Sequence, residues 1–458
     1  MKGCTTWSYH PYKPLLWNTG DIYVCRLAPG ADYIHLEWLA EPGTEYAIYY
    51  RKRDEGAFVL SGTVTGSGWD ITGLEDATDY ELYVQAGEKK SRVRLARTGL
   101  VPGTVVNYLH PDDDVYSFSG RYLCSPSILR HPEGFLLASM DLFAGAHPQN
   151  LTLIFRSDDD GKTWHYVSEL MPCFWGKLFL HRNELYMLSC STEYGDLLIG
   201  KSTDGGKTFS APVTLLRGAN GKNGSVGVHK NPENFLIHNG RLYQSLEWGA
   251  WANKDYCHAA MVMSCAVDDD LLDPANWHFT EPVKFDESFD PRLAGLGTCV
   301  MMIEGTVVLA PDGRLLNIMR FGYPGHAIAF EINQDDPDAP LAFSHLIPFP
   351  ANKSKFMIKQ DPVTGQFFSV ASYIENPEKP DRRLMTLMRS GDLMNWEKVC
   401  DLLDGRAYDP QDVGFQYVDF FFEGDDILYL CRTAMNKAHN YHDANYSTFH
   451  RIENFRSL

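Results

Sequence analysis

The chain has 458 residues, of which 44% are hydrophobic and 22% charged, and its formal net charge is −18. This length accommodates about two to four domains with a sizeable core. The negative charge argues against nucleic acid or an anionic membrane as partner, although a local cluster of arginines can still bind a small anion. No run of residues is apolar and long enough to span a bilayer.

The first 19 residues are predicted to form an extension ahead of the first domain. Their start, Met1 to Trp7, lacks the apolar core of a signal peptide, so we expect a cytoplasmic protein, or a secreted one whose leader has been removed. The ten cysteines show no C-x-x-C or other metal-binding spacing. We therefore expect buried free thiols, no metal centre and no cofactor, while the oligomeric state stays open.

Residues 20–98 carry a strand pattern of their own. Segment 33–38 alternates like a half-buried strand, and a second strand-like segment follows a Pro-Gly turn. Trp38, Leu74 and Tyr80 stand where a fibronectin type III domain has its strand tryptophan and its tyrosine corner. The segment resembles such a domain, which implies a β-sandwich that acts as a spacer or supports a catalytic domain. Residues 98–103 are predicted to be the linker.

Two octets, at 157–164 and 202–209, share the pattern S-x-D-x-G-x-T-[W/F] and stand 45 residues apart. The serine and the aspartate can bond to amides of their own turn, and the glycine takes a backbone conformation that other residues resist. The aromatic residue can fill the space beside the turn. The spacing is that of one blade of a β-propeller. The pattern resembles the Asp-box of sialidase-like propellers.

Weaker copies of the octet, at 264–277, 331–343 and 390–396, bring the number of units to about six. The segments between them are strand-like, and helical periodicity is nearly absent. The sequence therefore predicts an all-β protein: a six-bladed, sialidase-like β-propeller at 104–458, preceded by a fibronectin type III-like β-sandwich. Five or seven blades stay open as alternatives. In a propeller we expect the functional side chains at the mouth of the central channel, with one or two from each blade.

A predicted hairpin carries the best catalytic candidates. Its Pro-Asp-Gly turn at 311–313 lies midway between Glu304 and Arg320, so the two residues should lie at the same end of the hairpin. The hairpin resembles the sialidase stretch with a catalytic glutamate and an arginine, and 416–419 resembles the strand with the tyrosine nucleophile. A free tyrosine has a pKa of about 10 and is a poor nucleophile. The resemblance implies that Glu304 is the base that activates Tyr417.

Further arginines are candidates for a clamp around an acid group. Arg121 precedes the first propeller strand, and Arg382 stands eight residues before the weak octet at 390, with Arg383 as the alternative. Arg432 is a lesser candidate. Guanidinium groups present planar, permanently charged forks to a carboxylate. Together with the hairpin arginine they predict a site for an acidic sugar, although each could instead lie at the surface or between blades.

The general acid is where the pattern departs from that of sialidases. The resemblance implies an aspartate on the loop before the first octet, but residues 142–150 contain none. Asp141 lies earlier, at the end of a predicted strand, and His147 lies where the acid is expected. Histidine can act as acid or base near neutral pH, so both residues are candidates for the proton donor. Uronate lyases and rhamnosidases on related propellers rely on histidine.

Three further residues are candidates for substrate binding. Glu247 is followed by Trp248, with Trp251 close behind, and a carboxylate beside indoles suits a sugar subsite, although core packing explains the segment equally well. His442 belongs to a polar, aromatic segment before the last strand that could reach over the channel. A turn network that locks the last blade is the alternative for this segment.

These features predict a carbohydrate-active enzyme. The first hypothesis is a sialidase-like exo-glycosidase that removes a terminal acidic sugar from a glycan by a retaining mechanism through Tyr417. The alternatives are a polysaccharide or uronate lyase, or a rhamnosidase-like enzyme, in the same cleft, and a glycan-binding propeller without turnover. In each case the expected partner is a glycan or oligosaccharide.

Overall fold

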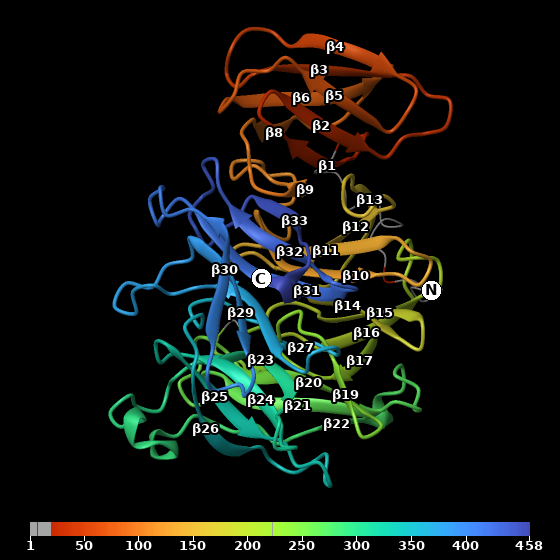
Figure 1. Cartoon of the computed structure of the whole chain (residues 1–458). Coiled ribbons are helices and arrows are strands. Elements are labelled where there is room, and N and C mark those ends of the chain that lie inside the picture. Colours follow the sequence, from red (N-terminus) through yellow and green to blue (C-terminus); the bar gives the residue numbers. More distant parts are fainter. Residues whose placement is uncertain (1–6, 8–19, 222) are drawn as a thin grey trace.

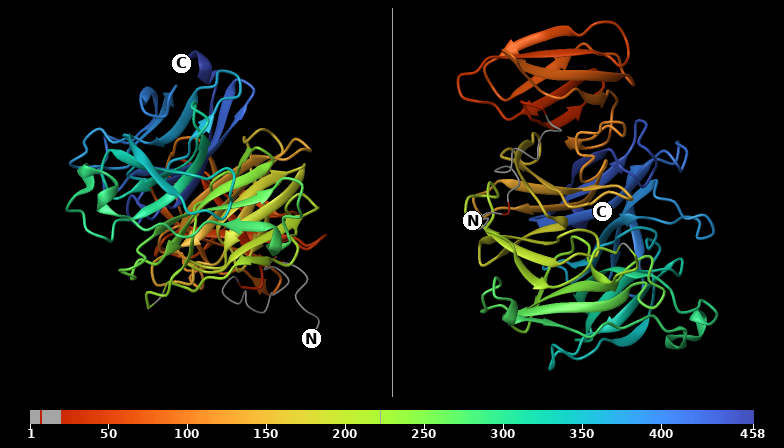
Figure 2. Two further views of the ribbon diagram at one scale, coloured as in Figure 1. Left: turned by 90° about the horizontal axis from the view of Figure 1, so that it is seen from below. Right: turned by 180° about the vertical axis from the view of Figure 1, so that it is seen from behind.

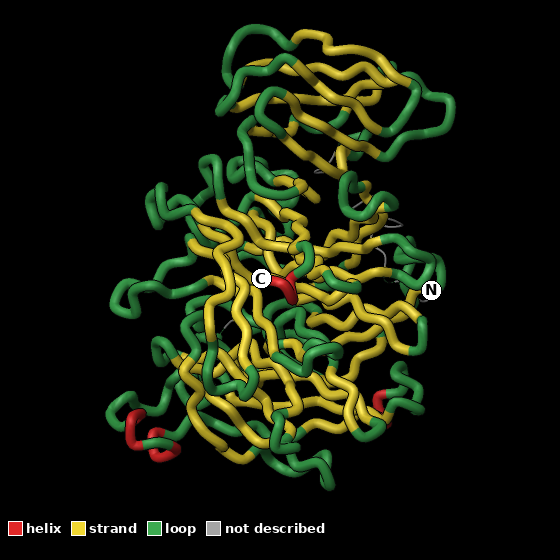
Figure 3. Tube along the Cα trace, viewed as in Figure 1, coloured by secondary structure: helices red, strands yellow, loops and turns green. Residues whose placement is uncertain are grey.

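The computed structural model describes Trp7, residues 20–221 and residues 223–458. The predicted extension at 1–19 therefore lies outside the described residues, except for Trp7. That indole is buried and donates a 2.7 Å hydrogen bond to the carbonyl of Pro172. The described chain is all-β, with strands joined by loops and a few short 3₁₀ turns (Figure 3).

Two antiparallel sheets form a sandwich at the N-terminal side of the molecule (Figure 1). One sheet has the order β1-β2-β5, and the other has the order β4-β3-β6-β7 with β8 also paired to β6. Trp38 and Tyr46 pack in its core with ring centroids 5.4 Å apart, and the amide of Glu75 donates to the hydroxyl of Tyr80. The likeness to fibronectin type III stays a prediction. The strands are β1 (Val24–Pro29), β2 (Tyr33–Trp38), β3 (Tyr46–Lys52), β4 (Val59–Val64), β5 (Gly68–Thr72), β6 (Asp79–Ala86), β7 (Lys89–Lys90) and β8 (Arg94–Arg97).

The rest of the described chain is a β-propeller built from six antiparallel sheets. Five of them use consecutive strands, in the orders β10 to β13, β14 to β17, β18-β20-β21-β22 with β19 paired to β20, β23 to β26, and β27 to β30. The first three sheets contain β10 (Tyr122–Arg130), β11 (Leu136–Phe143), β12 (Thr152–Ser157), β13 (His165–Leu170), β14 (Phe174–His181), β15 (Glu184–Cys190), β16 (Leu197–Ser202), β17 (Val213–Leu216), β18 (Gly227–His229), β19 (Leu236–His238), β20 (Arg241–Gly249), β21 (Ala259–Ala266) and β22 (Trp277–Phe279). The next two contain β23 (Met302–Leu309), β24 (Leu315–Phe321), β25 (His326–Glu331), β26 (Ala342–Pro348), β27 (Lys359–Gln360), β28 (Phe367–Ser372), β29 (Leu384–Ser390) and β30 (Glu397–Asp404).

The sixth sheet joins the two ends of the propeller. Its order is β31 (Gly414–Glu423), β32 (Asp426–Ala434), β33 (Tyr446–Ile452) and then β9 (Thr104–Tyr108), which comes from the start of the propeller. In the register Tyr446 pairs with Tyr108 and Thr448 pairs with Val105. The β9 segment lies between the sandwich and the rest of the propeller (Figures 1 and 2).

The two octets form the turns that their residue types predict. In the first, the hydroxyl of Ser157 accepts a 2.8 Å bond from the amide of Gly161, and Asp159 accepts a 2.8 Å bond from the amide of Thr163. Gly161 has a φ of +86°, a conformation that costs other residues energy. The octet at 202–209 repeats both bonds at 2.9 Å. The hydrogen bonding predicted within the octets is therefore confirmed.

Four of the sheets share a distortion in their first strand. Strands β10, β14, β23 and β31 each shift register near their N-terminal end, and each has one residue with a positive φ at the shift. These residues are Ser125 at 49°, Trp175 at 54°, Glu304 at 57° and Tyr417 at 55°. A β-bulge bends the strand and redirects a side chain, and bulges gather near active sites.

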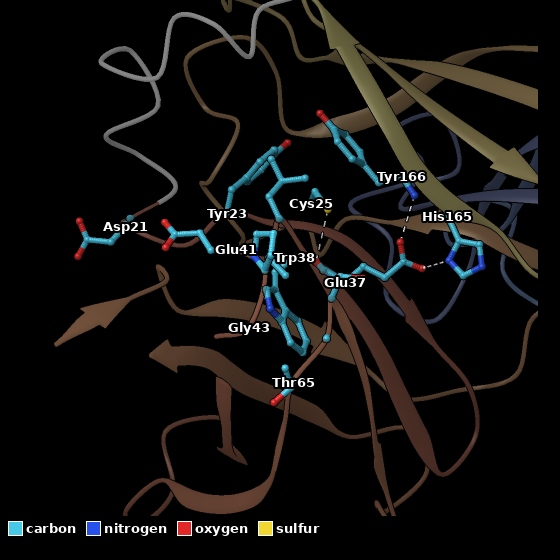
Figure 4. Close-up of a pocket in the computed structure, with 16 residues that line it drawn as sticks. Asp21, Tyr23, Cys25, Glu37, Trp38, Glu41, Gly43, Thr65, His165 and Tyr166 are labelled. Atoms are coloured by element: carbon cyan, nitrogen blue, oxygen red, sulfur yellow. Dashed lines mark hydrogen bonds and ion pairs between the residues drawn. The ribbon is translucent and has the colours of Figure 1, made fainter. Parts of the chain in front are cut away.

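The sandwich and the propeller meet in a polar interface. Arg94 Nε donates a 2.6 Å bond to Asp113 Oδ2, and both side chains are buried. Beside this contact a cavity of about 950 Å³ opens between the sandwich and β13. Glu37 lies at its wall, where it accepts a 3.1 Å bond from the amide of Tyr166 and lies 3.0 Å from His165 Nδ1 (Figure 4).

Nine cysteines lie in the described part of the chain, and all nine are free thiols. Six of them are buried, as the sequence predicts, whereas Cys299 is exposed. Across residues 20–221 and 223–458 the search for a membrane-crossing helix finds none that is both long and apolar enough.

Candidate active site

The bulges of β23 and β31 bring Glu304 and Tyr417 into direct contact. The Tyr417 hydroxyl donates a 2.5 Å hydrogen bond to Glu304 Oε1. Arg320 on β24 donates from Nη1 to Glu304 Oε2 at 2.7 Å and to the Tyr417 oxygen at 3.3 Å. Arg320 stands opposite Ile303 in the register, so the predicted placement of Glu304 and Arg320 at one end of the hairpin is confirmed.

The three side chains determine each other's protonation. Burial alone would raise the pKa of Glu304, but the charge of Arg320 and the bond from Tyr417 outweigh it, and the pKa is lowered. Burial raises the pKa of Tyr417, and the Glu304 carboxylate raises it further. At neutral pH the pair therefore consists of an ionised carboxylate and a neutral phenol, which is the state in which Glu304 can accept the phenolic proton.

Two more arginines lie against the ring of Tyr417. The guanidinium carbon of Arg432 is 4.9 Å from the ring centroid, and that of Arg382 is 5.7 Å away. Arg382 is held by the side-chain oxygen of Gln416 and by the carbonyl of Lys353, the latter at 3.0 Å. These contacts fix the guanidinium planes beside the phenol.

Positive charge exceeds negative charge around this tyrosine. Three guanidinium groups surround Tyr417, whose hydroxyl contacts one carboxylate, that of Glu304. The Nε atoms of Arg320, Arg382 and Arg432 are enclosed without a hydrogen-bond partner among the described residues. Burial, and then the charges of Arg382 and Arg320, lower the pKa of nearby Lys353. A cluster of guanidinium groups that outnumbers the carboxylates beside it is suited to bind an anion.

His442 covers one side of the arginine cluster. Its carbonyl accepts from Arg432, and its imidazole lies 2.8 Å from Asp443 and 5.3 Å, ring to ring, from Phe143. Burial and the charge of Arg432 lower the pKa of His442 to about 4, so the ring is neutral at pH 7. The segment before the last strand thus reaches the site, and Gln416 anchors it by a 2.6 Å bond to the carbonyl of Tyr441.

Two predicted arginines lie apart from these contacts. Arg383 pairs with Asp381 at 2.7 Å and donates to the carbonyl of Tyr408 at 2.8 Å. Arg121 forms no side-chain hydrogen bond, ion pair or cation–π contact within the described residues, although its charge contributes to the lowered pKa of Asp112. Of the two neighbours at 382 and 383, the structure places Arg382 at the tyrosine, and a role for Arg121 stays a prediction.

The two candidate proton donors have opposite environments. Asp141 on β11 is fully buried, accepts 2.5 Å and 3.3 Å bonds from Thr152 and the amide of Gly176, and has its pKa raised to about 7 by burial. His147 lies on the following loop, where its Nδ1 is 3.1 Å from the carbonyl of Gly145. No contact in the described residues joins either side chain to Tyr417 or Glu304, and their role as acid stays a prediction.

Glu247 and Trp248, which are adjacent on β20, face opposite ways because strand neighbours alternate. Trp248 packs against the apolar cluster between neighbouring sheets. Glu247 is buried on the other face, where its Oε2 lies 2.5 Å from His229 Nδ1 and its Oε1 accepts a 3.3 Å bond from the amide of Gly305. Glu247 is thereby connected to the strand that carries Glu304.

Sequence reasoning missed His229, Gln416 and Trp175. Trp175 could have been found from a shared pattern in the sequence. Trp175-Gly176 in β14 and Glu304-Gly305 in β23 both place a large side chain before a glycine at the bulge. A side chain at 305 would meet Ser245 at 2.2 Å, which explains that glycine. No local pattern marks His229, since its partner Glu247 lies on another strand.

No protein-family model and no curated protein matches the sequence. Among solved structures, the chain is similar to an α-L-arabinanase from Penicillium chrysogenum complexed with arabinobiose, with 15% identity, a TM-score of 0.51, and coverage of 78% of this chain and 99% of the other. An intramolecular trans-sialidase from Ruminococcus gnavus has 12% identity, a TM-score of 0.45, and coverage of 75% and 97%. The similarity to the arabinanase supports the propeller fold, and the sialidase resemblance of the sequence stays a prediction.

Proposed function

We propose that this protein is a glycoside hydrolase that removes a terminal sugar carrying a carboxylate, by a retaining mechanism. The observation that carries the proposal is the 2.5 Å bond from Tyr417 to Glu304 at the centre of three guanidinium groups. A phenol, a base and a cationic pocket are the three groups that such a reaction needs at the anomeric centre.

In the first step, the Tyr417 oxygen attacks the anomeric carbon while its proton passes to Glu304. The bond to the leaving-group oxygen breaks, and that oxygen keeps the electron pair and takes a proton from a general acid. In the second step, water attacks the same carbon and gives a proton to the group that served as general acid, the bond to Tyr417 breaks, and the phenolate recovers its proton from Glu304. Two displacements restore the original configuration at the anomeric carbon.

The arginines support an acidic substrate. Arg320, Arg382 and Arg432 place three positive charges beside the nucleophile. A neutral phenol can approach an anionic sugar without charge repulsion, whereas a carboxylate nucleophile would be repelled. The substrate's carboxylate would balance positive charge that the nearby carboxylates, Glu304 and Asp443, leave uncompensated.

The fold is consistent with this class of reaction. The arabinanase that it resembles is named for the hydrolysis of a sugar polymer and was solved with a disaccharide. We infer glycoside hydrolysis at the channel mouth of this propeller as well, with an oligosaccharide or glycan as partner.

The proposal is tested with a panel of glycans that end in sialic acids, in uronic acids and in neutral sugars, including arabinose. The expected result is release of an acidic monosaccharide whose first-formed anomer, followed by NMR, has the configuration of the substrate. Release of a neutral sugar alone would refute the acidic substrate, and an inverted first product would refute the tyrosine intermediate. An unsaturated product would identify a lyase, and binding without release would identify a glycan-binding protein.

A further inference from the structure

A second dyad lies next to the tyrosine and its base. His229 ends β18, and Glu247 lies opposite it in the register on β20. Their side chains are 2.5 Å apart, from Nδ1 to Oε2, and the exposed fractions are 4% and 0%. An ionised carboxylate can only accept, so Nδ1 carries the hydrogen and Nε2 is the nitrogen that remains for other partners.

The outer nitrogen of the dyad is not enclosed. The Nε2 atom of His229 has no hydrogen-bond partner among the described residues, and it is not among the enclosed atoms without partners, unlike Nδ1 of neighbouring His258. The ring of Trp175, which the bulge of β14 turns inward, lies 4.2 Å from the imidazole and limits its rotation. His229 is thus a held imidazole with one accessible nitrogen.

The dyad is also tied to the strand of the proposed base. Glu247 Oε1 accepts from the amide of Gly305, the residue after Glu304. The pKa of Glu304 responds to His229, which places the imidazole within electrostatic reach of the carboxylate. Tyr417 and the His229–Glu247 dyad therefore reach the strand segment 304–305 from different sheets.

We propose that His229, positioned by Glu247, is the general acid that protonates the leaving-group oxygen. This inference rests on the proposed function. In the first step His229 starts as an imidazolium, with Nδ1–H bonded to Glu247, and its Nε2–H passes a proton to the glycosidic oxygen as the bond from that oxygen to the anomeric carbon breaks. In the second step the neutral Nε2 takes a proton from the attacking water, so the imidazole returns to its starting state. Glu247 stabilises the charged ring and fixes its orientation, and it is a positioning residue.

The two donors suggested by the sequence are less suited to this task. Both oxygens of Asp141 are occupied or enclosed by Thr152 and Gly176, and the residue has no exposed surface. His147 is bonded only to its own loop, without a carboxylate to hold its ring. His229 alone among the three combines a fixed ring with an accessible nitrogen beside Glu304.

The test compares two substrates with the same acidic sugar. One has lactose as the leaving group, and the other has 4-nitrophenol, which leaves as a stable phenolate and needs little protonation. We expect His229→Gln to lower kcat/KM for the lactose-linked substrate by about 10²- to 10⁴-fold, the usual contribution of general acid catalysis, and for the nitrophenyl glycoside by less than about tenfold. An equal loss on both substrates would overturn the proposal.

Glu247→Gln provides a second, independent test of this assignment. This change keeps the shape of the side chain but removes the charge that stabilises the imidazolium, so the same split between the substrates is expected, with a smaller loss. His238→Gln is the matched control, because this histidine ends the neighbouring strand β19 and its imidazole contacts Gln334 instead, so the ratio of the two rates should stay unchanged. Circular dichroism and the unfolding midpoint verify that each variant is folded.

The outcomes separate this inference from the proposed function. If the wild-type protein hydrolyses neither substrate, the proposed function fails and the inference fails with it. If Tyr417→Phe abolishes hydrolysis of both substrates but His229→Gln and Glu247→Gln show no split, only the assignment of the acid is wrong. A split caused by Asp141→Asn or His147→Gln instead would transfer the role to that residue.

Discussion

Tyr417 and Glu304 are 113 residues apart in the sequence, and a 2.5 Å hydrogen bond from the phenol to the carboxylate joins them. Both residues occupy the positive-φ position of a β-bulge, in strands of different sheets. Unusual backbone geometry at two contacting residues is typical of a site kept for function, because each bulge costs stability that packing elsewhere must offset.

The first prediction concerns this pair. Tyr417→Phe removes the nucleophilic oxygen, and Glu304→Gln removes the base, so each should lower kcat for the acidic glycan by at least about 10²-fold. The measurement is the initial rate of sugar release at saturating substrate. Tyr408→Phe is the control, since Tyr408 is 52% exposed, and its rate should equal that of the wild type. An undiminished rate in Tyr417→Phe would remove the tyrosine from the mechanism.

The second prediction uses two adjacent arginines. Arg382 lies against Tyr417, whereas Arg383 pairs with Asp381. Charge-assisted hydrogen bonds contribute about 1.5–3 kcal/mol, so Arg382→Gln should lower kcat/KM about ten- to hundredfold for the carboxylate substrate. On an analogue in which a carboxamide replaces the carboxylate of the sugar, Arg382→Gln should have the same kcat/KM as the wild type. Arg383→Gln should match the wild type on both substrates, and a similar loss in the two variants would argue against a specific clamp.

Much of the fold can be predicted from short-range patterns. The octets at 157 and 202 specify a turn through residues within the turn itself, and the alternation at 33–38 specifies a strand, so neither depends on distant contacts. The order of strands in the sheets is harder to predict from the sequence, because the pairing of β9 with β33 brings together segments from opposite ends of the propeller.

The site could be predicted only in part, for the same physical reason. Glu304 and Arg320 belong to one hairpin, and their relation follows from a single turn. His229 depends on a carboxylate from another strand, and Arg382 differs from Arg383 by its contact with Gln416, which belongs to another sheet. Such relations arise when sheets pack together, and sequence spacing does not encode them.

The third prediction is a pH dependence of stability at Asp141. Its pKa is about 7 in the folded protein and about 3.9 in an unfolded chain. Between these values the folded state binds more protons, so this residue lowers the free energy of unfolding as pH rises from about 4 to 7 and adds no further change above that. Asp141→Asn should remove this loss of stability. Its free energy of unfolding should therefore exceed that of the wild type by an amount that grows to a few kcal/mol by pH 8.

Urea unfolding at pH 4, 6 and 8 measures this difference between the wild type and Asp141→Asn. Asp159→Asn is the contrasting variant, because hydrogen bonds to Thr163 and Ser157 lower the pKa of Asp159 despite the opposing effect of partial burial. That aspartate stabilises the fold above its unfolded pKa and loses this effect as pH falls. A constant difference between Asp141→Asn and the wild type at all three pH values would contradict the raised pKa.

The fourth prediction compares the glycines of the two octets. Gly161 and Gly206 both have a φ of +86°. A Cβ at 161 would lie 2.0 Å from the ring of Phe449, whereas a Cβ at 206 would lie 3.4 Å from Leu137. Gly206→Ala should cost about 1–2 kcal/mol for the left-handed backbone, and Gly161→Ala about 1–3 kcal/mol more for overpacking. Chemical denaturation measures both, and equal losses would show that Phe449 moves aside freely.

The fifth prediction compares two adjacent aspartates at the interface with the sandwich. Asp113 is buried with Arg94, whereas Asp114 pairs with Arg92 at the surface. Removal of one partner of a buried pair costs about 3–5 kcal/mol, so Asp113→Ala should be strongly destabilising. Asp114→Ala should cost less than about 1 kcal/mol. Thermal unfolding measures both, and similar melting temperatures for the two variants would show that the buried pair does not hold the interface.

The order of strands in the sixth sheet has a consequence for synthesis of the chain. Strand β9 is translated before the other propeller strands, but its only partner in the described sheet, β33, follows after all five other sheets. Until then β9 exposes an unpaired edge next to the sandwich, and unpaired edges are sites of wrong association. A chain that lacks β33 would therefore keep five of its sheets and still lack a closed ring, so premature termination before β33 should produce aggregation rather than a shortened propeller.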